Sequence, residues 1–477
     1  MVSKLQSILK EKGPIKKIGV LGMGYVGIPA AALFAEADEF DLVLGFQRDS
    51  KTSGYKIDML NRGESPLKGE EPGLEELLKK VVDAGKFVCT SDFSRISEMD
   101  AVALAIQTPF ANPKDLEPDF SALNAGIRNV GKFLQPGMLV VLESTITPGT
   151  TDGMARAILE EESRLVAGED FALAHAPERV MVGRLLRNIQ EHDRIVGGID
   201  PASTQRAIEL YAPVMTKGKV IPMTAKAAEV TKTAENTFRD LQIAAANQLA
   251  LYCEAMGINF YDVRAGIDSL KGEGITRAVL WPGAGVGGHC LTKDTYHLER
   301  GVKISDLNLD YPDGAESIFV LARKVNDFMP THMYHLTLEG LSHIGKRLED
   351  ARVAILGWAF INNSDDSRNT PSEPYRDLLI QDGAEVAVHD PHVLDYPGLP
   401  ISENLDEVVK GADVISIMTS HHDYFKLDPD HLKKLSGQRH PVIVDGRNVI
   451  DPDRFIGAGF VFKGIGRGDK NGHEILQ

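Results

Sequence analysis

The chain is poor in cysteine: among 477 residues it has three, Cys89, Cys253 and Cys290. They form no CxxC pair, and three scattered thiols are too few for a disulfide framework. Cysteine and histidine also lack the spacing that is typical of zinc sites, so we expect no metal. These absences favour a reducing, cytoplasmic setting.

Long apolar runs and excess positive charge are missing as well. No apolar stretch reaches the ~18 residues of a membrane-spanning helix, and residues 1–17 lack the continuous apolar core of a secretory signal. The net charge of -16 argues against a nucleic-acid or anionic-membrane partner. We therefore expect a soluble globular protein, and its length exceeds what one hydrophobic core usually serves.

Strand-like apolar runs alternate with helical segments in two parts of the sequence. In the first part the runs are 17–21, 42–46, 101–106, 138–142, 171–174 and 194–196, and in the second they are 352–356, 385–389, 413–418 and 441–444. Such alternation indicates parallel sheets with both faces covered by helices.

The middle of the chain is helical, and residues 225–256 predict one helix of roughly 48 Å. The fold class is thus α/β, with two Rossmann-like parallel-sheet domains joined by a helical middle with a long spine helix. The expected domains are 1–213, which binds a dinucleotide, 214–330, which is helical, and 331–477, the second α/β domain.

A glycine-rich turn follows the first strand-like run and opens a helix. Its residues are Gly22, Met23, Gly24, Tyr25, Val26 and Gly27. In this pattern the first glycine permits a tight turn, the second lets the backbone approach a pyrophosphate, and the third lets the helix pack on the strand. The turn predicts a nicotinamide dinucleotide cofactor.

The end of the second strand leaves the choice of cofactor open. An NAD site normally has an acidic residue here to bind the ribose, but this chain has Gln47 followed by Arg48. Arg48, with Ser50 and Lys51 nearby, could hold a 2′-phosphate, and Asp49 could still reach a ribose. NAD is the expected cofactor and NADP the alternative.

Polar residues close three further strand-like runs. They are Thr108, then Glu143, Ser144 and Thr145, and then Glu178 and Arg179. Each group alone is compatible with a helix cap or a turn. Because ligands bind beyond the carboxyl ends of parallel strands, the three groups together favour a shared cleft.

The long predicted helix carries a polar stripe. At 100° per residue its members fall within about 80° of one another; they are Glu229, Lys232, Asn236, Asp240 and Asn247. Such a stripe is either a solvated face or a functional one, and the pattern favours neither.

Cys290 lies in a glycine-rich polar loop, 283–294, whereas Cys253 lies in an apolar helical stretch. His289 and Lys293 are close enough in sequence to stabilise a thiolate, and Asp294 could transfer a proton. The setting favours a nucleophile at Cys290 and buried structural roles for the other two thiols.

Six motifs resemble the UDP-glucose/GDP-mannose dehydrogenase family, and the resemblance runs from Lys17 to about Asn448. The motifs are GMGYVG at 22–27, STITPG at 144–149, PERV at 177–180, AENTFRD at 234–240, GVGGHCLTKD at 285–294 and GWAF…DDSRNTP at 357–371. The resemblance implies an NAD domain, a dimer-forming helical middle, a UDP-binding C-terminal domain, and a four-electron oxidation with two cofactors in turn.

The resemblance also implies roles for individual residues. Cys290 would form a thiohemiacetal and then a thioester, Lys232 and Asn236 would stabilise oxyanions, Asp294 and Thr145 would handle water or protons, and Glu178 would promote thioester hydrolysis. The cofactor would contact residues 22–27, Gln47, Arg48, Thr108 and Thr145. The substrate would contact Glu178, Arg179, Val180, Lys232, Asn236, Arg277, Gly285, Gly287, Phe360 and Arg368.

The PERVMVGRLLRN and GGHCLT segments are similar to those of dehydrogenases of UDP-N-acetylhexosamines, with ManNAc as the first choice and GlcNAc or GalNAc next. One departure is Ile361, where many members have Lys, which leaves Arg368 as the better C-terminal cation. Three alternatives stay open: a UDP-glucose 6-dehydrogenase, a two-electron hydroxyacid-type dehydrogenase, and a non-catalytic nucleotide sensor. A homodimer or higher homo-oligomer is expected.

Overall fold

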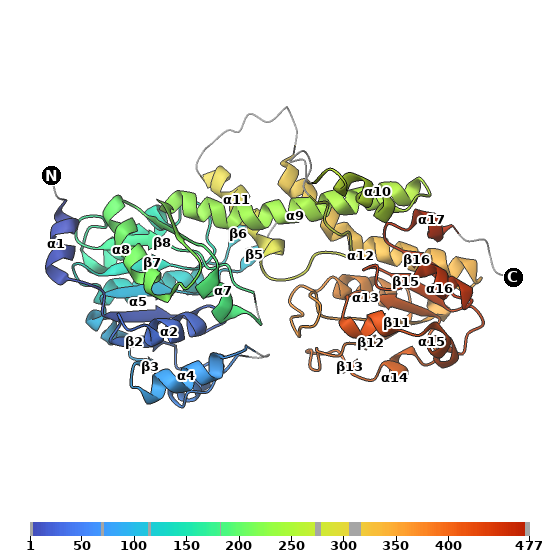
Figure 1. Cartoon of the computed structure of the whole chain (residues 1–477), viewed down its shortest axis with the longest axis horizontal. Helices are drawn as coiled ribbons and strands as arrows, with labels where there is room; N and C mark the ends of the chain where they lie inside the picture. The colour runs from blue at the N-terminus through green and yellow to red at the C-terminus, as the bar shows by residue number, and fades with distance from the viewer. Residues whose placement is uncertain are drawn as a thin grey trace. The chain divides into compact units, whose positions relative to one another are not determined.

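The computed structural model describes residues 3–67, 71–112, 116–181, 183–271, 278–304 and 316–472. These residues form two compact units, which Figure 1 colours by position in the chain. The first unit consists of Met1–Glu235 and Tyr296–Leu309, and the second of Asn236–Thr295 and Asp310–Gln477.

The first unit is built on an eight-stranded sheet in the order β10-β9-β8-β7-β4-β1-β2-β3. Neighbouring strands are parallel except for β8 and β9, which are antiparallel. The strands are β1 (Lys17–Leu21), β2 (Leu42–Phe46), β3 (Phe87–Thr90), β4 (Ala101–Leu104), β7 (Leu139–Leu142), β8 (Ala172–His175), β9 (Arg194–Gly198) and β10 (Val220–Thr224), and a small antiparallel pair comprises β5 (Phe110–Asn112) and β6 (Glu117–Pro118).

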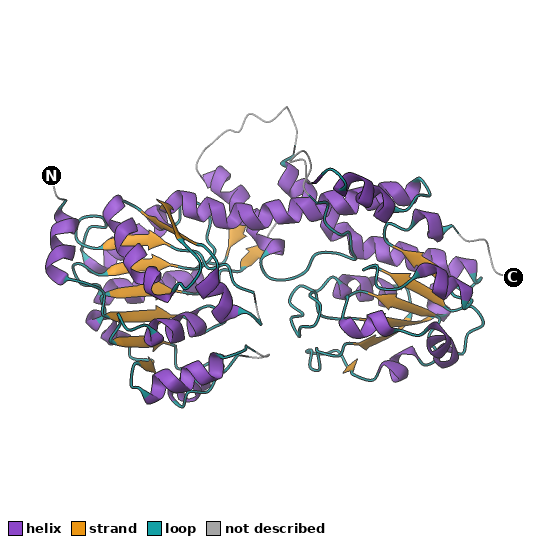
Figure 2. Cartoon of the chain, in the orientation of Figure 1, coloured by secondary structure: helices purple, strands orange, loops and turns teal. Residues whose placement is uncertain are grey.

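Successive side chains of the central strands enter two separate hydrophobic clusters, one on each face of this sheet. Ile18 and Val20 of β1 belong to one cluster, and Leu21 belongs to the other. Because both faces must be covered, the strands read as continuous apolar runs rather than as alternating ones. Figure 2 shows helices packed along the sheet.

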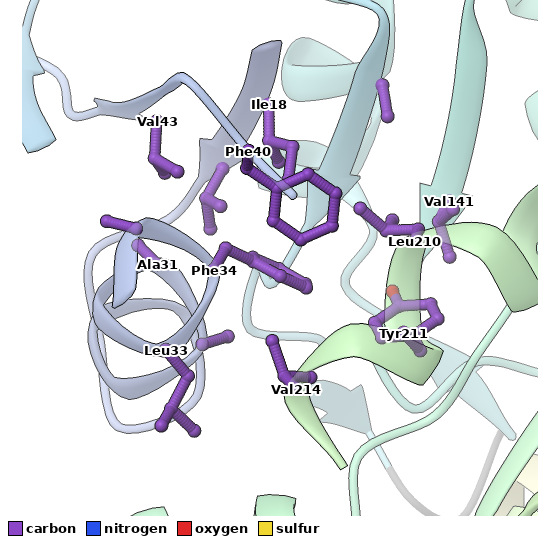
Figure 3. Close-up of a cluster of buried hydrophobic side chains, with 14 of the residues drawn as sticks. Ile18, Ala31, Leu33, Phe34, Phe40, Val43, Val141, Leu210, Tyr211 and Val214 are labelled. Atoms are coloured by element: carbon purple, nitrogen blue, oxygen red, sulfur yellow. The ribbon is translucent and has the colours of Figure 1, made fainter. Parts of the chain in front are cut away.

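Helices of the first unit divide between these two clusters. The first cluster takes residues from α1 (Lys4–Lys12), α2 (Gly27–Glu36), α3 (Tyr55–Asn61), α4 (Leu74–Asp83), α7 (Leu185–Glu191) and α8 (Pro201–Tyr211), and the second takes residues from α5 (Ser121–Phe133) and α6 (Arg156–Ser163). Figure 3 shows aromatic rings meeting in the first cluster, where Phe34 lies 6.0 Å from Phe40 and 5.8 Å from Tyr211 between ring centroids. This packing fixes α2, and with it the glycine turn that precedes α2.

The second unit has a six-stranded, wholly parallel sheet in the order β13-β12-β11-β14-β15-β16. Its strands are β11 (Arg352–Leu356), β12 (Glu385–His389), β13 (Ile401–Ser402), β14 (Val414–Ile417), β15 (Val442–Asp445) and β16 (Val461–Gly464). One face is covered by α9 (Ala225–Ala255), α12 (Ile318–His343) and α13 (Ser372–Gln381), and the other by α14 (Leu405–Val409), α15 (Pro429–Ser436) and α16 (Pro452–Gly457). Two shorter helices are α10 (Phe260–Asp268) and α17 (Gly468–Asn471).

Two helices contribute residues to both units. The helix α9 (Ala225–Ala255) has 31 residues and no break, so it is ~46 Å long. The helix α11 (Leu291–Ile304) begins directly after Cys290. The predicted fold class, with two parallel-sheet domains and a long helix, is therefore confirmed, whereas the predicted domain boundaries stay predictions.

The predicted runs leave out six of the strands that the structure describes, namely β3, β5, β6, β10, β13 and β16. β3 alternates buried and exposed residues over only four positions, so it lacks the continuous apolar run that marks the other four-residue strands. β10 is an edge strand that contains Pro222 and is largely exposed, as proline favours an edge, so it shows no apolar run. None of the helices within the described ranges is apolar enough over its length to span a membrane.

Candidate active site

The glycine turn between β1 and α2 leaves the backbone open on one side. Gly22 has a φ of +100°, and a Cβ there would lie 2.5 Å from the carbonyl oxygen of Ala105. A Cβ on Gly27 would collide with the carbonyl oxygen of Gly22, whereas one on Gly24 would meet nothing within 4 Å. The first and third glycines are thus required by packing, and the second faces open space, as close approach of a pyrophosphate demands.

A cavity of about 390 Å³ opens at this turn, lined by Gly22, Met23 and Gly24 and by the end of β2 at Gln47 and Arg48. This cavity lies at the carboxyl ends of the strands, where open α/β sheets bind ligands. Its described residues fit the adenosine half of a dinucleotide.

Lys56 is a lining residue that the sequence analysis missed. Its Nζ donates a hydrogen bond to the carbonyl oxygen of Met23 at 3.0 Å, and burial lowers the pKa of Lys56. The described lining of the cavity contains Lys56 and Arg48 but no carboxylate. Gln47 donates to Ser53 Oγ at 3.0 Å. The position of Lys56 on the first turn of α3, ten residues past the end of β2 at Phe46, offered no recognisable sequence signal.

Hydrogen bonds tie the ends of β4 and β7 together beside the cavity. Ser144 Oγ donates to the carbonyl oxygen of Ile106 at 2.6 Å and accepts from its N–H at 3.0 Å. Thr108 Oγ1 donates to the carbonyl oxygen of Thr145 at 2.5 Å. The structure therefore brings Thr108 and Thr145 together, as the sequence analysis predicted for strand ends of one sheet.

Glu178 belongs to a buried charge network. Arg194 forms ion pairs with both Glu178 and Glu143, and Tyr211 donates its hydroxyl to Glu143 at 2.8 Å. Burial raises the pKa of Glu143. The guanidinium of Arg194 also stacks on the ring of Tyr211 at 3.8 Å. Two carboxylates sharing one cation hold Glu178 in a defined place.

The neighbours of Glu178 are partly buried. The N–H of Arg179 donates to Glu178 Oε1 at 2.7 Å, and its guanidinium binds the carbonyl oxygen of Asp193 and, at 3.4 Å, Glu235. Val180 packs against the hydrophobic cluster of the first unit. Arg179 is thus engaged within the protein, in addition to any role with substrate.

The polar stripe on α9 is buried and not solvated. Every member is at most 8% exposed: Glu229, Lys232, Asn236, Asp240 and Asn247. Glu229 accepts from the N–H groups of Gly149 and Thr151 at 2.5 and 2.7 Å, and burial raises its pKa. Burial excludes a solvated face, and the hydrogen-bonded members each fix a loop or a helix, whereas a functional role of the stripe stays a prediction.

Cys290 is exposed and directly precedes α11, and its carbonyl oxygen accepts from the N–H groups of Lys293 and Asp294 at 3.1 and 2.9 Å. Asp294, one turn into α11, is fully buried. Asn236 Nδ2 donates to Asp294 Oδ2 at 2.6 Å, and Lys293 Nζ lies 3.3 Å from Asp294 Oδ1. The structure thus brings Cys290, Asp294 and Asn236 together.

His289 behaves differently from the sequence expectation. Burial, with the nearby Lys293 and Arg368, lowers the pKa of His289 to about 4. The imidazole is therefore neutral at pH 7 and adds no positive charge beside Cys290. Of the two cations Lys293 and Arg368, Lys293 is nearer to Cys290 in the sequence, and its Nζ also contacts the carboxylate of Asp294.

The glycines before Cys290 make room for protein atoms. A Cβ on Gly287 would collide with Phe360, and one on Gly288 would lie 2.8 Å from the ring of Phe360. A Cβ on Gly285 would lie 2.7 Å from Pro371. The space beside Gly285 and Gly287 is therefore filled by protein atoms of the segment 360–371, and the predicted substrate contacts of these two glycines stay predictions.

Arg368 is about half exposed and forms a bidentate ion pair with Asp366, at 2.5 and 2.8 Å. Its carbonyl oxygen accepts from the N–H of Gly288 at 2.9 Å. Ile361 is 41% exposed. Arg277 lies outside the described residues.

Arg447 also borders the glycine-rich loop 283–294 that contains Cys290, called the cysteine loop below. The sequence analysis did not single out this arginine. Its Nη2 donates to the carbonyl oxygen of Gly285 at 3.2 Å and its Nε to that of Met418 at 2.8 Å. Burial lowers the pKa of Arg447 to about 10. The signal was available, because Asp445-Gly446-Arg447 follows the apolar run 441–444 directly.

These features define a class of protein: a nicotinamide-dependent dehydrogenase with a Rossmann-type cofactor cavity and an exposed thiol beside a buried carboxylate–amide pair. Within this class, the chain belongs to the UDP-glucose/GDP-mannose dehydrogenase family. Models of that family match as its NAD binding domain over residues 16–215, its central domain over 226–319 and its UDP binding domain over 354–452.

Several known proteins are similar over nearly the whole chain. A UDP-N-acetyl-D-mannosamine dehydrogenase of Pyrococcus horikoshii is 36% identical and aligns with 95% of this chain and 100% of its own length. An NDP-N-acetyl-D-galactosaminuronic acid dehydrogenase of Ralstonia solanacearum is 31% identical, over 91% of this chain and 96% of its own. The crystal structure of an NDP-N-acetyl-D-galactosaminuronic acid dehydrogenase from Methanosarcina mazei Go1 has a TM-score of 0.93 at 76% identity and covers 99% of this chain and 100% of its own.

The predicted family, the dehydrogenase class and the choice of NAD as cofactor are confirmed. The chain is an NAD-dependent nucleotide-sugar dehydrogenase, with a UDP-binding domain. The roles given to single residues stay predictions.

Proposed function

We propose that this enzyme oxidises C6 of a UDP-N-acetylhexosamine from the alcohol to the carboxylate, reducing two NAD per sugar. The observation that carries the four-electron reaction is an exposed thiol, Cys290, beside the buried pair of Asn236 and Asp294. The hexosamine is supported by relatives named for N-acetyl-D-mannosamine and N-acetyl-D-galactosaminuronic acid. ManNAc and GalNAc are therefore the epimers to assay first, followed by GlcNAc.

The residues that we assign to NAD are 22–27, Gln47, Arg48, Thr108 and Thr145. The open backbone at Gly24 and the cavity beyond it support this assignment. When bound, NAD accepts one hydride in each of the two oxidations.

Cys290 is the nucleophile of the second oxidation. An aldehyde carbon carries no hydride that leaves easily, so Sγ first adds to C6 and forms a thiohemiacetal. Loss of hydride from that carbon leaves a thioester on Sγ. Water then adds to the thioester, and collapse releases the carboxylate and restores the thiol, so the overall reaction consumes one water and releases protons.

Lys232 and Asn236 stabilise the oxygen that becomes negative in these steps. An asparagine amide has two N–H donors, so Asn236 can donate to Asp294 and to an oxyanion together. Asp294 and Thr145 handle water and protons, and Glu178, held by Arg194, promotes hydrolysis of the thioester.

For the sugar nucleotide we assign Glu178, Arg179, Val180, Lys232, Asn236, Arg277, Gly285, Gly287, Phe360 and Arg368. Phe360 offers an aromatic face and Arg368 a guanidinium that Asp366 orients. Guanidinium groups bind phosphate oxygens in a bidentate manner. The C-terminal α/β domain, 331–477, would therefore hold the UDP portion.

The experiment is an assay of UDP-ManNAc, UDP-GalNAc, UDP-GlcNAc and UDP-glucose, with NADH and carboxylate product counted for each. Two NADH per acid with an N-acetylhexosamine is the expected result. One NADH per sugar would indicate a two-electron dehydrogenase, none would indicate a nucleotide sensor, and preference for UDP-glucose would indicate a UDP-glucose 6-dehydrogenase.

We also propose that two or more copies of the chain associate through the helical middle. Phe238 and Tyr252 on α9 are 53% and 59% exposed, and with Ala245 between them they repeat every seven residues on one face. Leu321 and Phe328 of α12 have the same spacing and are also exposed. Large apolar side chains in such a row favour a second copy of this chain over water. The enzyme is expected to act in the cytoplasm.

A further inference from the structure

A continuous chain of buried polar side chains joins α9 and α12 in the second unit. Arg323 Nη1 donates to Asp240 Oδ1 at 2.6 Å, and Asn326 Nδ2 donates to the same oxygen at 2.7 Å. Asn247 Nδ2 donates to Asn326 Oδ1 at 2.9 Å. The exposed fraction of each of the four side chains is 2% or less, so water does not substitute for any partner.

This series of hydrogen-bonded side chains ends on the backbone of the cysteine loop. The N–H of Gly283 donates to Asn247 Oδ1 at 2.9 Å, and this contact is also buried. A buried N–H without an acceptor costs roughly 1–3 kcal/mol, so Asn247 is the group that makes this position of Gly283 favourable.

The direction of each hydrogen bond follows from the charged end. Arg323 can only donate and an ionised Asp240 can only accept. Asn326 must therefore turn its Nδ2 toward Asp240, which leaves its Oδ1 to accept from Asn247. Asn247 in turn must present Oδ1 to the N–H of Gly283. The donor and acceptor of every hydrogen bond in the series are thereby fixed.

The helix α9 thereby holds both ends of the segment that carries Cys290. Asn247 binds Gly283 at the start of the segment, and Asn236 binds Asp294 at its end. The two asparagines lie on the same face of α9, about three turns or roughly 16 Å apart. A rigid helix thus fixes the start and the end of the segment whose interior contains the thiol.

We propose that Asn247 is a positioning residue for Cys290, which it places through Gly283 and the chain of Asn326, Asp240 and Arg323. The inference rests on the proposed function of Cys290 as the nucleophile. Asn247 touches neither thiol nor substrate. A misplacement of reacting atoms by about 1 Å can cost on the order of 10²-fold in rate. The position of the loop must therefore be held to within that distance.

The test compares Asn247→Leu, which keeps the size of the side chain and removes its hydrogen bonds, with wild type. Gln248→Ala is the matched control, since Gln248 is the next residue on α9 and is exposed. For each full-length enzyme, kcat and KM for the UDP-sugar, the rate of Cys290 alkylation by iodoacetamide, NAD affinity and Tm are measured.

For Asn247→Leu we expect kcat to fall about 10- to 100-fold with KM changed less than about threefold, and the alkylation rate of Cys290 to change at least about threefold. NAD affinity should stay the same, because the cofactor cavity lies in the other unit. Gln248→Ala should match wild type in every measurement. A normal kcat and alkylation rate in a folded Asn247→Leu enzyme would overturn the proposal, as would loss of kcat with an unchanged alkylation rate.

Asn247→Asp gives an independent check of the polarity. When ionised, the introduced carboxylate would turn an oxygen toward Asn326 Oδ1, whereas when protonated it could donate a hydrogen bond to that oxygen. The kcat of this variant relative to wild type should therefore be higher at pH 6 than at pH 8. A ratio that does not change with pH would overturn the hydrogen-bond chain. If Cys290→Ser formed acid normally, the proposed function would fail, while the alkylation measurement would still report on loop position.

Discussion

Asn236 donates its side-chain amide to a fully buried carboxylate, Asp294, across 2.6 Å. One residue comes from the polar stripe of α9 and the other from the first turn of α11. Lys293 contacts the second oxygen of the same carboxylate. A buried carboxylate that is paired on both oxygens is held in one place.

Replacing Asp294 with Asn should lower kcat by about 10²- to 10⁴-fold, the usual range for loss of a general acid–base group. The substitution keeps the size of the side chain and removes its charge. The measurement is kcat and kcat/KM for the UDP-sugar with NAD. Asp268→Asn, a change to another helical aspartate in the second unit, is the control, and equal losses in both variants would contradict a specific role.

Cys290→Ser should end formation of the carboxylate product while UDP-sugar binding persists. A serine hydroxyl is far less ionised near pH 7 than a thiol, so addition to the aldehyde is lost. Product acid and NADH are counted by chromatography and absorbance, and UDP-sugar binding by calorimetry. Cys253→Ala removes a buried thiol and should leave the two NADH per acid unchanged. Near-normal acid production by Cys290→Ser would exclude the thioester route.

NAD should be used with higher kcat/KM than NADP, and Arg48→Ala should lower the remaining activity with NADP about tenfold while changing that with NAD little. The reason is that Arg48 is exposed at the end of β2, where a 2′-phosphate would meet it, as charged groups bind phosphate strongly. Lys79→Ala, a change to an exposed lysine of α4 that does not line the cavity, is the comparison and should change neither activity. A kcat/KM higher with NADP than with NAD would contradict the cofactor assignment.

Stability should depend on Asp390 in acid. Burial raises the pKa of Asp390, but the hydrogen bonds from His421 and from backbone N–H groups outweigh it and hold the pKa at about 2. The folded pKa lies below the unfolded value of about 3.9, so this carboxylate stabilises the fold above pH ~4 and loses its effect as pH falls toward 2.

Asp390→Asn should therefore lower the free energy of unfolding by about 2 kcal/mol at pH 7, and the difference from wild type should shrink as the pH is lowered from 5 to 3. Urea unfolding at each pH measures it. A difference that grows in acid would contradict the assigned sign.

Phe238→Glu should convert the oligomer to monomers at micromolar concentration, because it places a charge in the exposed apolar row on α9. Sedimentation velocity measures the mass, with Gln248→Ala as the control on the same helix. A wild-type monomer under these conditions, or an unchanged oligomer in Phe238→Glu, would argue against this face as the interface.

Much of this protein could be predicted from its sequence alone. Short-range patterns predict the central strands and the long helix. Side chains point to the same face every two residues in a strand and about every 3.6 residues in a helix, and a strand with both faces buried is apolar throughout. The glycine turn at 22–27 and the thiol of Cys290 in its glycine-rich loop could also be recognised from the sequence, because glycine and cysteine have properties that few other residues share.

Only the tertiary structure decided what the polar residues do. The stripe on α9 has the same pattern whether it meets water or protein, and the partners of Asp240 and Asn247 lie about 80 residues away in the chain. Likewise, His289 could be a cation in the sequence and is neutral in the fold, because burial removes its charge. The glycines at 285–288 show the same limit. The sequence shows that several glycines stand together in this loop, but only the fold shows that Phe360 and Pro371 pack against them. The physical reason is that burial and long-range contacts are properties of the folded chain.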